Sequence, residues 1–324
     1  MDQASKRRGR PLPDAINMKP IAFNLEDALA VETLYRPNLL VIQQDLKPWE
    51  VTLNSRDSSV QILRFFRVWF DVPQTIFYSA VTYLDLFLAR MKVQEKCLSC
   101  VTISCFYIAT LRENINIDVN QLVSISQSKC SVADMTRMAG IIKDKLKLEN
   151  HNNGRLTTCA DILLIFLDIL NCIDSTFRQQ LKDEQLLTRL EVLLADSNCA
   201  FFRSSTLALA LLRLEIEKVM TQAIAVKKVY KIGEFIHLLA MIRDIQVKCK
   251  IKTTELVNCS SNASKVLKQY DNQDRTKHSQ NLMWRFSSST FSKGKRNRNY
   301  HLPLDTIQEK TLANNRFHKK MRTN

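Results

Sequence analysis

The stretch "CLSCVTISCFYIATLREN", from Cys97 to Asn114, decides the fold of this chain. Its first fifteen residues carry no charge, although the chain as a whole has a net charge of +15. An apolar run of this length is too short to span a bilayer, which takes about 20 residues. A short helix that is apolar nearly all round must be buried on every side. We therefore expect a helix surrounded by other helices, and no membrane segment.

The composition favours helices throughout. The chain has 324 residues, which is room for two ordinary domains with extensions, and 45% of them are hydrophobic. It contains only 5 glycines and 7 prolines. Many-stranded sheets and phosphate-cradling loops need more glycine than this. The sequence therefore predicts an all-α protein.

Apolar residues around the opening stretch recur with helical spacing. Pro73 is suited to the first turn of one helix, and Ser131 is suited to N-cap another, with Asp134 three residues later. Together with the opening stretch, the pattern predicts five short helices in about ninety residues. They are expected at Arg56–Trp69, from Pro73 onward, at Cys97–Leu111, after Asp118 and after Ser131.

A polar segment, "ENHNNGRLTT", interrupts this pattern and indicates a linker. A second helical set follows, and its third member contains "SSTLALALLRLEIE" (204–217), which is again unusually apolar. The sequence therefore predicts two related five-helix domains, at residues 54–150 and 155–270. The second set is expected at Leu156–Asn171, Ser175–Ala195, Phe202–Lys218, Ile232–Ile245 and Thr253–Tyr270.

The two ends differ in composition from the middle. Residues 1–53 hold five of the seven prolines and a basic cluster, and we expect them to be mostly disordered, with a short helix near Asn24–Thr33. Residues 271–324 contain 12 Lys or Arg against 4 Asp or Glu, so +8 of the net charge lies there. A basic segment poor in aliphatic residues is predicted to be a mostly disordered tail.

Signals for enzyme chemistry are missing from the sequence. The 5 histidines are scattered, and no glycine-rich phosphate loop or zinc-protease motif is present. Cys97 and Cys100 form a C-x-x-C, but with no second pair nearby to complete four zinc ligands. The N-terminus is polar and basic, and we expect no signal peptide there. The nine cysteines are therefore expected to be reduced and to be mainly small buried side chains. We expect no catalytic residue, no cofactor and no metal.

Two five-helix bundles around a buried third helix resemble the cyclin architecture. The segment "AVTYLDLFLARMKVQEKCLSCVTISCFYIA" (80–109) resembles the cyclin-box signature. "MKVQEKCLSCVTISCFYIA", "SVADMTRM" and "HLPLDTIQE" are most similar to the G-type cyclins. The resemblance covers roughly residues 54–310 and implies two tandem cyclin boxes with no chemistry of their own. A cyclin acts by binding a protein kinase or another protein partner.

The resemblance also assigns individual positions. Arg56 and Asp85 match an arginine–aspartate pair that joins the first two helices of the box. Leu111 and Ala139 stand where many kinase-activating cyclins carry a lysine and a glutamate, and Leu86 replaces an arginine. The substrate dock that some cyclins use falls on Ser55, Ser59 and Ile62, and two hydroxyls there predict that it is absent. The possible kinase-contact surface comprises Leu111, Arg112, Glu113, Ala139 and Lys143.

The tail carries a second candidate site. Leu304, Ile307 and Glu309 spell L-x-x-I-x-E within "LDTIQE". This pattern resembles the motif by which proteins dock on the B′ regulatory subunits of protein phosphatase 2A, which G-type cyclins as a family recruit. Phosphorylation of Thr306 would add negative charge to the same segment. The alternative is a tail strand that packs on the second box.

The N-terminal "KRRGRP" is best suited to a nuclear import signal; the alternatives are the core of an AT-hook and a plain solvated tail. The residues concerned are Lys6, Arg7, Arg8, Gly9, Arg10 and Pro11. The leading hypothesis is a non-enzymatic G-type cyclin of nucleus and cytoplasm that recruits the phosphatase. The alternatives are a regulatory subunit of a cyclin-dependent kinase and, less favoured, a nuclear DNA- or transcription-associated factor. Because the excess positive charge lies in the tails, nucleic-acid binding is expected to be weak or absent.

Overall fold

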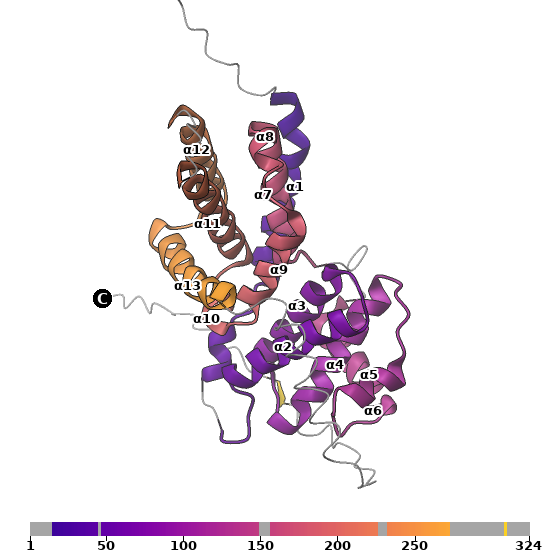
Figure 1. Ribbon diagram of the computed structural model, residues 1–324. Coiled ribbons are helices and arrows are strands. Elements are labelled where there is room, and N and C mark those ends of the chain that lie inside the picture. The colour runs from indigo at the N-terminus through magenta and orange to yellow at the C-terminus, as the bar shows by residue number, and fades with distance from the viewer. Residues whose placement is uncertain (1–14, 45–46, 149–155, 226–231, 273–307, 310–324) are drawn as a thin grey trace, which may run out of the picture.

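A computed structural model describes residues 15–44, 47–148, 156–225, 232–272 and 308–309 of the chain. Within these ranges the protein is almost entirely helical, and its helices form two groups that Figure 1 shows as a lower and an upper lobe. The lower lobe, α2 to α6, is called the first bundle. The upper lobe, α7 to α13 with α1 beside it, is called the second bundle. The predicted all-α class is confirmed.

The first bundle is built around the opening stretch of sequence. Its helices are α2 (Leu53–Trp69), α3 (Gln74–Arg90), α4 (Glu95–Arg112), α5 (Val119–Ile125) and α6 (Val132–Leu146). Each of the other four contacts α4. Ile103, Phe106 and Ile108 of α4 are no more than 1% exposed. The helix that contains the uncharged run Cys97–Leu111 is therefore the centre of a five-helix bundle, as the sequence predicts.

Side-chain caps fix where these helices begin. Ser131 accepts a hydrogen bond from the backbone N–H of Asp134, whose carboxylate accepts one from the Ser131 N–H. Asp118 caps α5 by accepting from the N–H groups of Asn120 and Gln121. Both satisfy N–H groups that have no partner inside the helix. The predicted start of α6 at Ser131 is confirmed.

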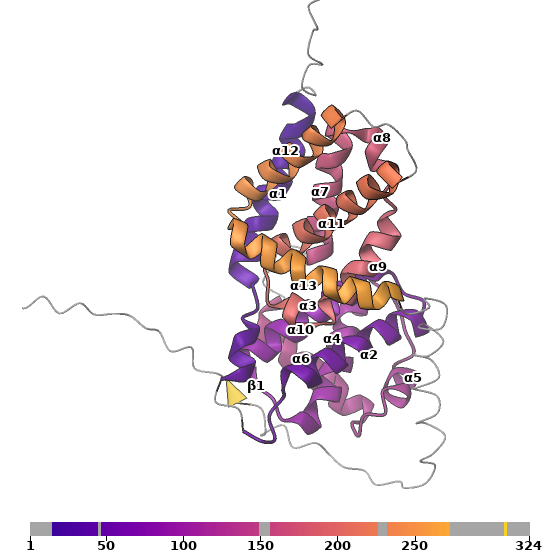
Figure 2. The ribbon, with the colours of Figure 1, turned by 60° about the vertical axis from the view of Figure 1, so that its left-hand side comes forward.

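The second bundle likewise surrounds a central helix, with two four-residue helices, α8 and α10, among its elements. Its centre is α11 (Ser204–Ala225), which contacts the surrounding α7, α9, α12 and α13. The remaining elements are α7 (Cys159–Ile173), α8 (Ser175–Arg178), α9 (Asp183–Leu194), α10 (Ser197–Ala200), α12 (Ile232–Lys248) and α13 (Thr253–Asn272). α13 crosses the face of this bundle in Figure 2.

The single helix predicted at Ser175–Ala195 is wrong, because α8 ends at Arg178 and α9 begins at Asp183. The guanidinium of Arg178 spans the break: it donates to the Leu181 carbonyl and pairs with Asp183. Leu181 is itself buried. Neither proline nor glycine marks this break in the sequence, so it could be found only from the packing of Leu181 and the ion pair of Arg178 with Asp183.

The N-terminal part of the chain is more ordered than the sequence suggests. α1 (Ala15–Tyr35) is 21 residues long and packs along α7 of the second bundle, more than a hundred residues away in sequence. Glu32 is buried, and its carboxylate accepts from the N–H and the hydroxyl of Ser205, at 2.7 and 2.8 Å. The expectation of a mostly disordered segment with only a short helix is therefore wrong for residues 15–44.

A short 3-10 helix and two short strands pack against the first bundle. The 3-10 helix η1 (Leu39–Gln43) packs on α3, and β1 (Met91–Lys92) links α3 to α4. β1 pairs antiparallel with β2 (Gln308–Glu309), with Met91 opposite Glu309 and Lys92 opposite Gln308. β2 is the yellow arrow beside β1 in Figure 2. The C-terminal segment thus reaches the first bundle, whereas the sequence alternative placed it on the second.

Candidate functional site

The pair predicted between Arg56 and Asp85 is present and completely buried. Arg56 donates from Nε to one carboxylate oxygen of Asp85 at 2.8 Å and from a terminal nitrogen to the other at 2.6 Å. The Arg56 side chain is 0% exposed. Burial lowers the pKa of Arg56, but the neighbouring carboxylates of Asp85 and Asp57 raise it by more, so the net effect is a raised pKa. This bidentate geometry orients α2 against α3.

The same arginine also reaches the second bundle, which the sequence did not indicate. Its remaining terminal nitrogen donates to the Leu194 carbonyl at the end of α9, at 2.7 Å. Asp57 accepts from the backbone N–H of Ser197 at the start of α10, at 3.0 Å. Arg56 and Asp57 therefore join the two bundles as well as two helices of the first.

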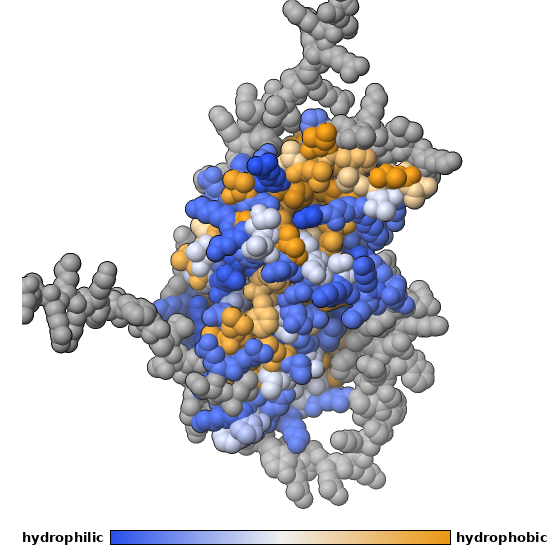
Figure 3. Space-filling view, turned by 90° about the vertical axis from the view of Figure 1, so that its left-hand side faces the viewer, coloured by the Kyte–Doolittle hydropathy of each residue, from blue (hydrophilic) through white to orange (hydrophobic). Residues whose placement is uncertain are grey.

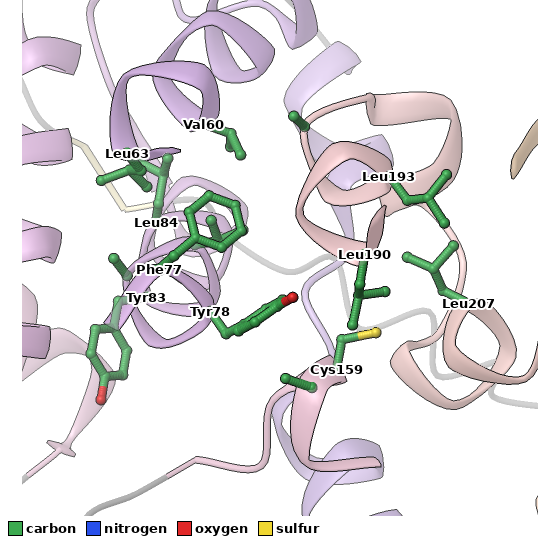
Figure 4. Packing of buried hydrophobic residues seen from close by; sticks show 14 of the residues in the cluster. Val60, Leu63, Phe77, Tyr78, Tyr83, Leu84, Cys159, Leu190, Leu193 and Leu207 are labelled. Atoms are coloured by element: carbon green, nitrogen blue, oxygen red, sulfur yellow. The ribbon is translucent and has the colours of Figure 1, made fainter. Parts of the chain in front are cut away.

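Further polar contacts continue this junction. Glu191 of α9 is 1% exposed and lies 3.0 Å from Arg67 and 3.7 Å from Arg64, both on α2. Tyr78 of α3 donates its hydroxyl proton to the Leu187 carbonyl at 2.6 Å. Figure 4 shows the Tyr78 ring pointing out of the first bundle toward the second. These contacts hold the two bundles in one relative orientation.

The possible kinase-contact surface is only partly exposed. Leu111 is 42% exposed and Glu113 is exposed at the end of α4, and Lys143 on α6 is half-buried. Ala139 is 3% exposed, so its side chain belongs to the core between α6 and α4 rather than to that surface.

Arg112 of this surface already has a neighbour within the bundle. Burial raises the pKa of the Tyr83 hydroxyl, and a hydrogen bond with the adjacent Arg112 partly offsets that effect. The sequence did not indicate this contact, because Tyr83 lies on α3, 29 residues earlier. A partner that binds Arg112 must therefore compete with the phenol.

The substrate dock was predicted to be absent, and the side chains at its positions, Ser55, Ser59 and Ile62, lie on α2. Ser55 and Thr52 form a reciprocal cap at the start of α2. The Ser59 hydroxyl donates to the Ser55 carbonyl at 3.0 Å, and Ser59 is 3% exposed. Ile62 is half-buried. Two hydroxyls committed to the backbone leave little apolar surface for a peptide.

The cysteines behave as buried side chains. Cys97 and Cys100 are each 1% exposed on α4. The Cys100 thiol is hydrogen-bonded to Cys130, which lowers the pKa of Cys130 to about 7 and raises that of Cys100. Among the described residues no cluster of His, Cys, Asp or Glu could hold a metal ion. In the same ranges no helix has both the length and the apolar character needed to cross a bilayer.

The tail motif is described only at its end. Glu309 lies on β2 and pairs with Met91. Leu304 and Ile307 lie outside the described residues, as do Lys6 to Pro11 of the basic N-terminal segment. The sequence did not indicate the partner strand, because "MKV" (91–93) is too short to predict a strand by alternation.

Comparison with known proteins identifies the family. The family model "Cyclin, N-terminal domain" matches residues 24–149. Human Cyclin-G2 is 32% identical over 263 residues, covering 78% of this chain and 70% of that protein. Rat Cyclin-G1 is 30% identical over 269 residues, covering 80% and 84%. Drosophila melanogaster Cyclin G is 30% identical over 270 residues, which are 80% of this chain and 46% of that longer protein.

The fold points the same way. The solved structure of a viral cyclin from herpesvirus saimiri superposes with a TM-score of 0.56 at 17% identity, covering 76% of this chain and 99% of the viral one. The match spans both bundles, as expected for two tandem boxes. The chain belongs to the cyclin G family, and like other cyclins it is a regulatory protein of the cell cycle rather than an enzyme.

Proposed function

We propose that this chain is an adaptor that recruits protein phosphatase 2A through the B′ regulatory subunit. The observation that carries the proposal is the sequence L-x-x-I-x-E, formed by Leu304, Ile307 and Glu309, in the tail of a G-type cyclin. The two bundles then act as a scaffold that holds regulated protein partners near the phosphatase.

The chemistry of the motif supports this reading. Two aliphatic side chains three residues apart can fill two pockets when the segment is extended, and a glutamate two residues later can meet a basic patch. Thirty-five residues separate the end of α13 at Asn272 from Gln308. An extended segment of that length reaches up to roughly 120 Å, which is enough to engage a second protein without moving the bundles.

The test is a binding assay with the purified B′ subunit and the full chain. Replacing Leu304, Ile307 and Glu309 with alanine should weaken binding at least about a hundredfold, since two buried aliphatic side chains contribute roughly 3 kcal/mol or more. The matched control carries Asp305→Ala and Gln308→Ala, at the unfixed positions of the motif. Equal binding by the triple variant and the control would remove the phosphatase proposal.

Kinase binding is the second candidate, and the end of α4 favours it. Leu111 is exposed there although most large apolar residues of this bundle are buried, and Glu113 beside it is exposed and charged. Exchange of the charges, Arg112→Glu with Glu113→Arg, should weaken the capture of a cyclin-dependent kinase. The exchange leaves the net charge unchanged, so the matched control exchanges an exposed pair at the other end of α4, Glu95→Lys with Lys96→Glu. Undiminished capture by the exchanged variant would place the kinase contact elsewhere.

The basic N-terminal segment supports a location in both nucleus and cytoplasm. Replacement of Lys6, Arg7, Arg8 and Arg10 with alanine should shift a fluorescently tagged chain toward the cytoplasm. The same variant tests the DNA-associated alternative, because an AT-hook requires the arginines of R-G-R-P. An unchanged distribution would exclude the import signal.

A further inference from the structure

β1 continues into residues 93–95, and the extended segment 91–95 has two sides. The body of the first bundle pairs with only one side, through residues 93–95. On that side Val51 donates its N–H to the Val93 carbonyl at 3.0 Å, and Glu95 donates to the Trp49 carbonyl at 2.9 Å. Glu50 and Gln94 form an antiparallel bridge between these bonds. Since successive residues of a strand direct their backbone groups to opposite sides, Lys92 faces away from this partner.

The other side of β1 is where β2 pairs. Lys92 lies opposite Gln308 and Met91 opposite Glu309. The extended segment 91–95 therefore lies between two others, because residues 49–51 pair with its residues 93–95 and β2 pairs with β1 on the opposite side. Without β2 the outer edge would present unpaired N–H and C=O groups, which is the template for adding an extended peptide.

The rest of the first bundle holds this edge in place. Met91 is 4% exposed and Val93 3% exposed, so both side chains anchor the segment in the core. α3 ends at Arg90, whose guanidinium donates to the Lys145 carbonyl at 3.0 Å, and α4 begins at Glu95. A strand fixed at both ends needs little ordering when a peptide pairs with it.

We propose that the outer edge of β1 is a docking site for the C-terminal segment of this same chain, and that docking there excludes docking on the phosphatase. The proposal rests on the proposed function. Glu309 belongs both to the strand paired with Met91 and to the L-x-x-I-x-E motif. One backbone cannot pair with β1 and lie extended in a groove of the B′ subunit at the same time.

The pairing itself is tested by cross-linking, without the phosphatase. Residues opposite each other in an antiparallel pair have Cα atoms about 4.5–5.5 Å apart, which suits a disulfide. In the full chain, Lys92→Cys with Gln308→Cys should therefore cross-link in glutathione buffer at least about tenfold faster than Lys92→Cys with Lys310→Cys, which is two residues out of register. Equal rates for the two pairs would overturn the proposal.

The competition is tested by Lys92→Pro. Proline removes the N–H of residue 92 and cannot continue the ladder on the outer side. Met91 already has φ −117° and ψ 141°, which is the extended conformation that a residue before proline prefers. Lys92→Ala is the matched control, because it removes the charge and keeps the N–H. Thermal unfolding of both variants checks that the bundle remains intact.

The expected result is a tighter complex when pairing is blocked. A motif that is paired for about nine-tenths of the time binds about tenfold more weakly than the free motif. The Lys92→Pro chain should therefore approach the affinity of a synthetic peptide of residues 300–312 for the B′ subunit, while Lys92→Ala should match the unaltered chain. Register-specific cross-linking with no gain from Lys92→Pro would overturn the competition. A peptide that fails to bind the B′ subunit would instead overturn the proposed function, with the cross-linking result unaffected.

Discussion

The central helices of the two bundles, α4 and α11, differ in how completely they are enclosed. α4 is buried from Cys97 to Thr110 except at Ser99 and Tyr107. Its polar residues are satisfied close by: the Ser104 hydroxyl donates to the Cys100 carbonyl at 2.7 Å and lies 3.0 Å from the Met135 carbonyl. The buried residues of α11 all lie between Ser205 and Ile216, and Ile224 near its end is 67% exposed.

The second bundle also depends on a helix from outside its own segment. α1 packs on α7, and Glu32 satisfies the backbone N–H of Ser205 at the start of α11. Figure 3 shows hydrophobic side chains gathered at the upper end of this bundle. The five helices of the first bundle are therefore consecutive in sequence, whereas the second bundle needs the N-terminal helix α1 to complete its core.

The largest effect is expected at the centre of the first bundle. Phe106 is 0% exposed, and its ring centroid lies 5.4 Å from that of Phe66 and 6.0 Å from that of Phe70. Phe106→Ala should lower the free energy of unfolding by about 3–5 kcal/mol because it leaves a cavity among these rings. Urea denaturation measures the change. Leu111→Ala on the same helix is the exposed control, and a comparable loss there would contradict the enclosed core.

A somewhat smaller effect is expected at the junction. Asp85→Ala leaves Arg56 buried with only Asp57 as a carboxylate partner, and loss of one member of a buried pair costs about 3 kcal/mol. Because Arg56 also donates to Leu194, the orientation of the bundles should loosen. Amide hydrogen exchange in α9 and α10 measures this. Protection that remains unchanged in both helices would show that Arg56 does not join the bundles.

The smallest effect tests the dependence of the second bundle on α1. Glu32→Ala removes two hydrogen bonds to Ser205 and should cost about 1.5–3 kcal/mol. The loss should appear as faster hydrogen exchange in α7 and α11, with α4 unaffected. Glu26→Ala, at an exposed position of the same helix, is the matched control. Equal exchange in the two variants would mean that α1 only covers the bundle.

Local signals in the sequence predicted most of the first bundle. The apolar period of α3, the uncharged run Cys97–Leu111 within α4 and the Ser131 cap of α6 each depend on residues in or next to one helix. The Arg56–Asp85 pair was predicted from resemblance, and its geometry is confirmed. Such features can be predicted from the sequence because the interactions behind them are local or belong to a family pattern.

The features that could not be predicted depend on contacts between distant segments. Because of Pro20 and the nearby prolines, residues 15–44 were expected to be mostly disordered. The structure instead has the helix α1 there, packed along α7. Arg56 reaches Leu194 across 138 residues, and β1 finds its second partner at the far end of the chain. Two features of the candidate kinase-contact surface also depend on packing between helices and could not be predicted: the burial of Ala139 and the contact of Arg112 with Tyr83.

One purification tests the central claim most directly, because it separates the tail from the bundles. The full chain and a chain lacking residues 300–311 are each used to capture partners from cells, and the B′ subunit is quantified in both. The account predicts that the deletion removes the B′ subunit and leaves the thermal unfolding of the two bundles unchanged. Recovery of equal amounts of the B′ subunit by both chains would contradict it.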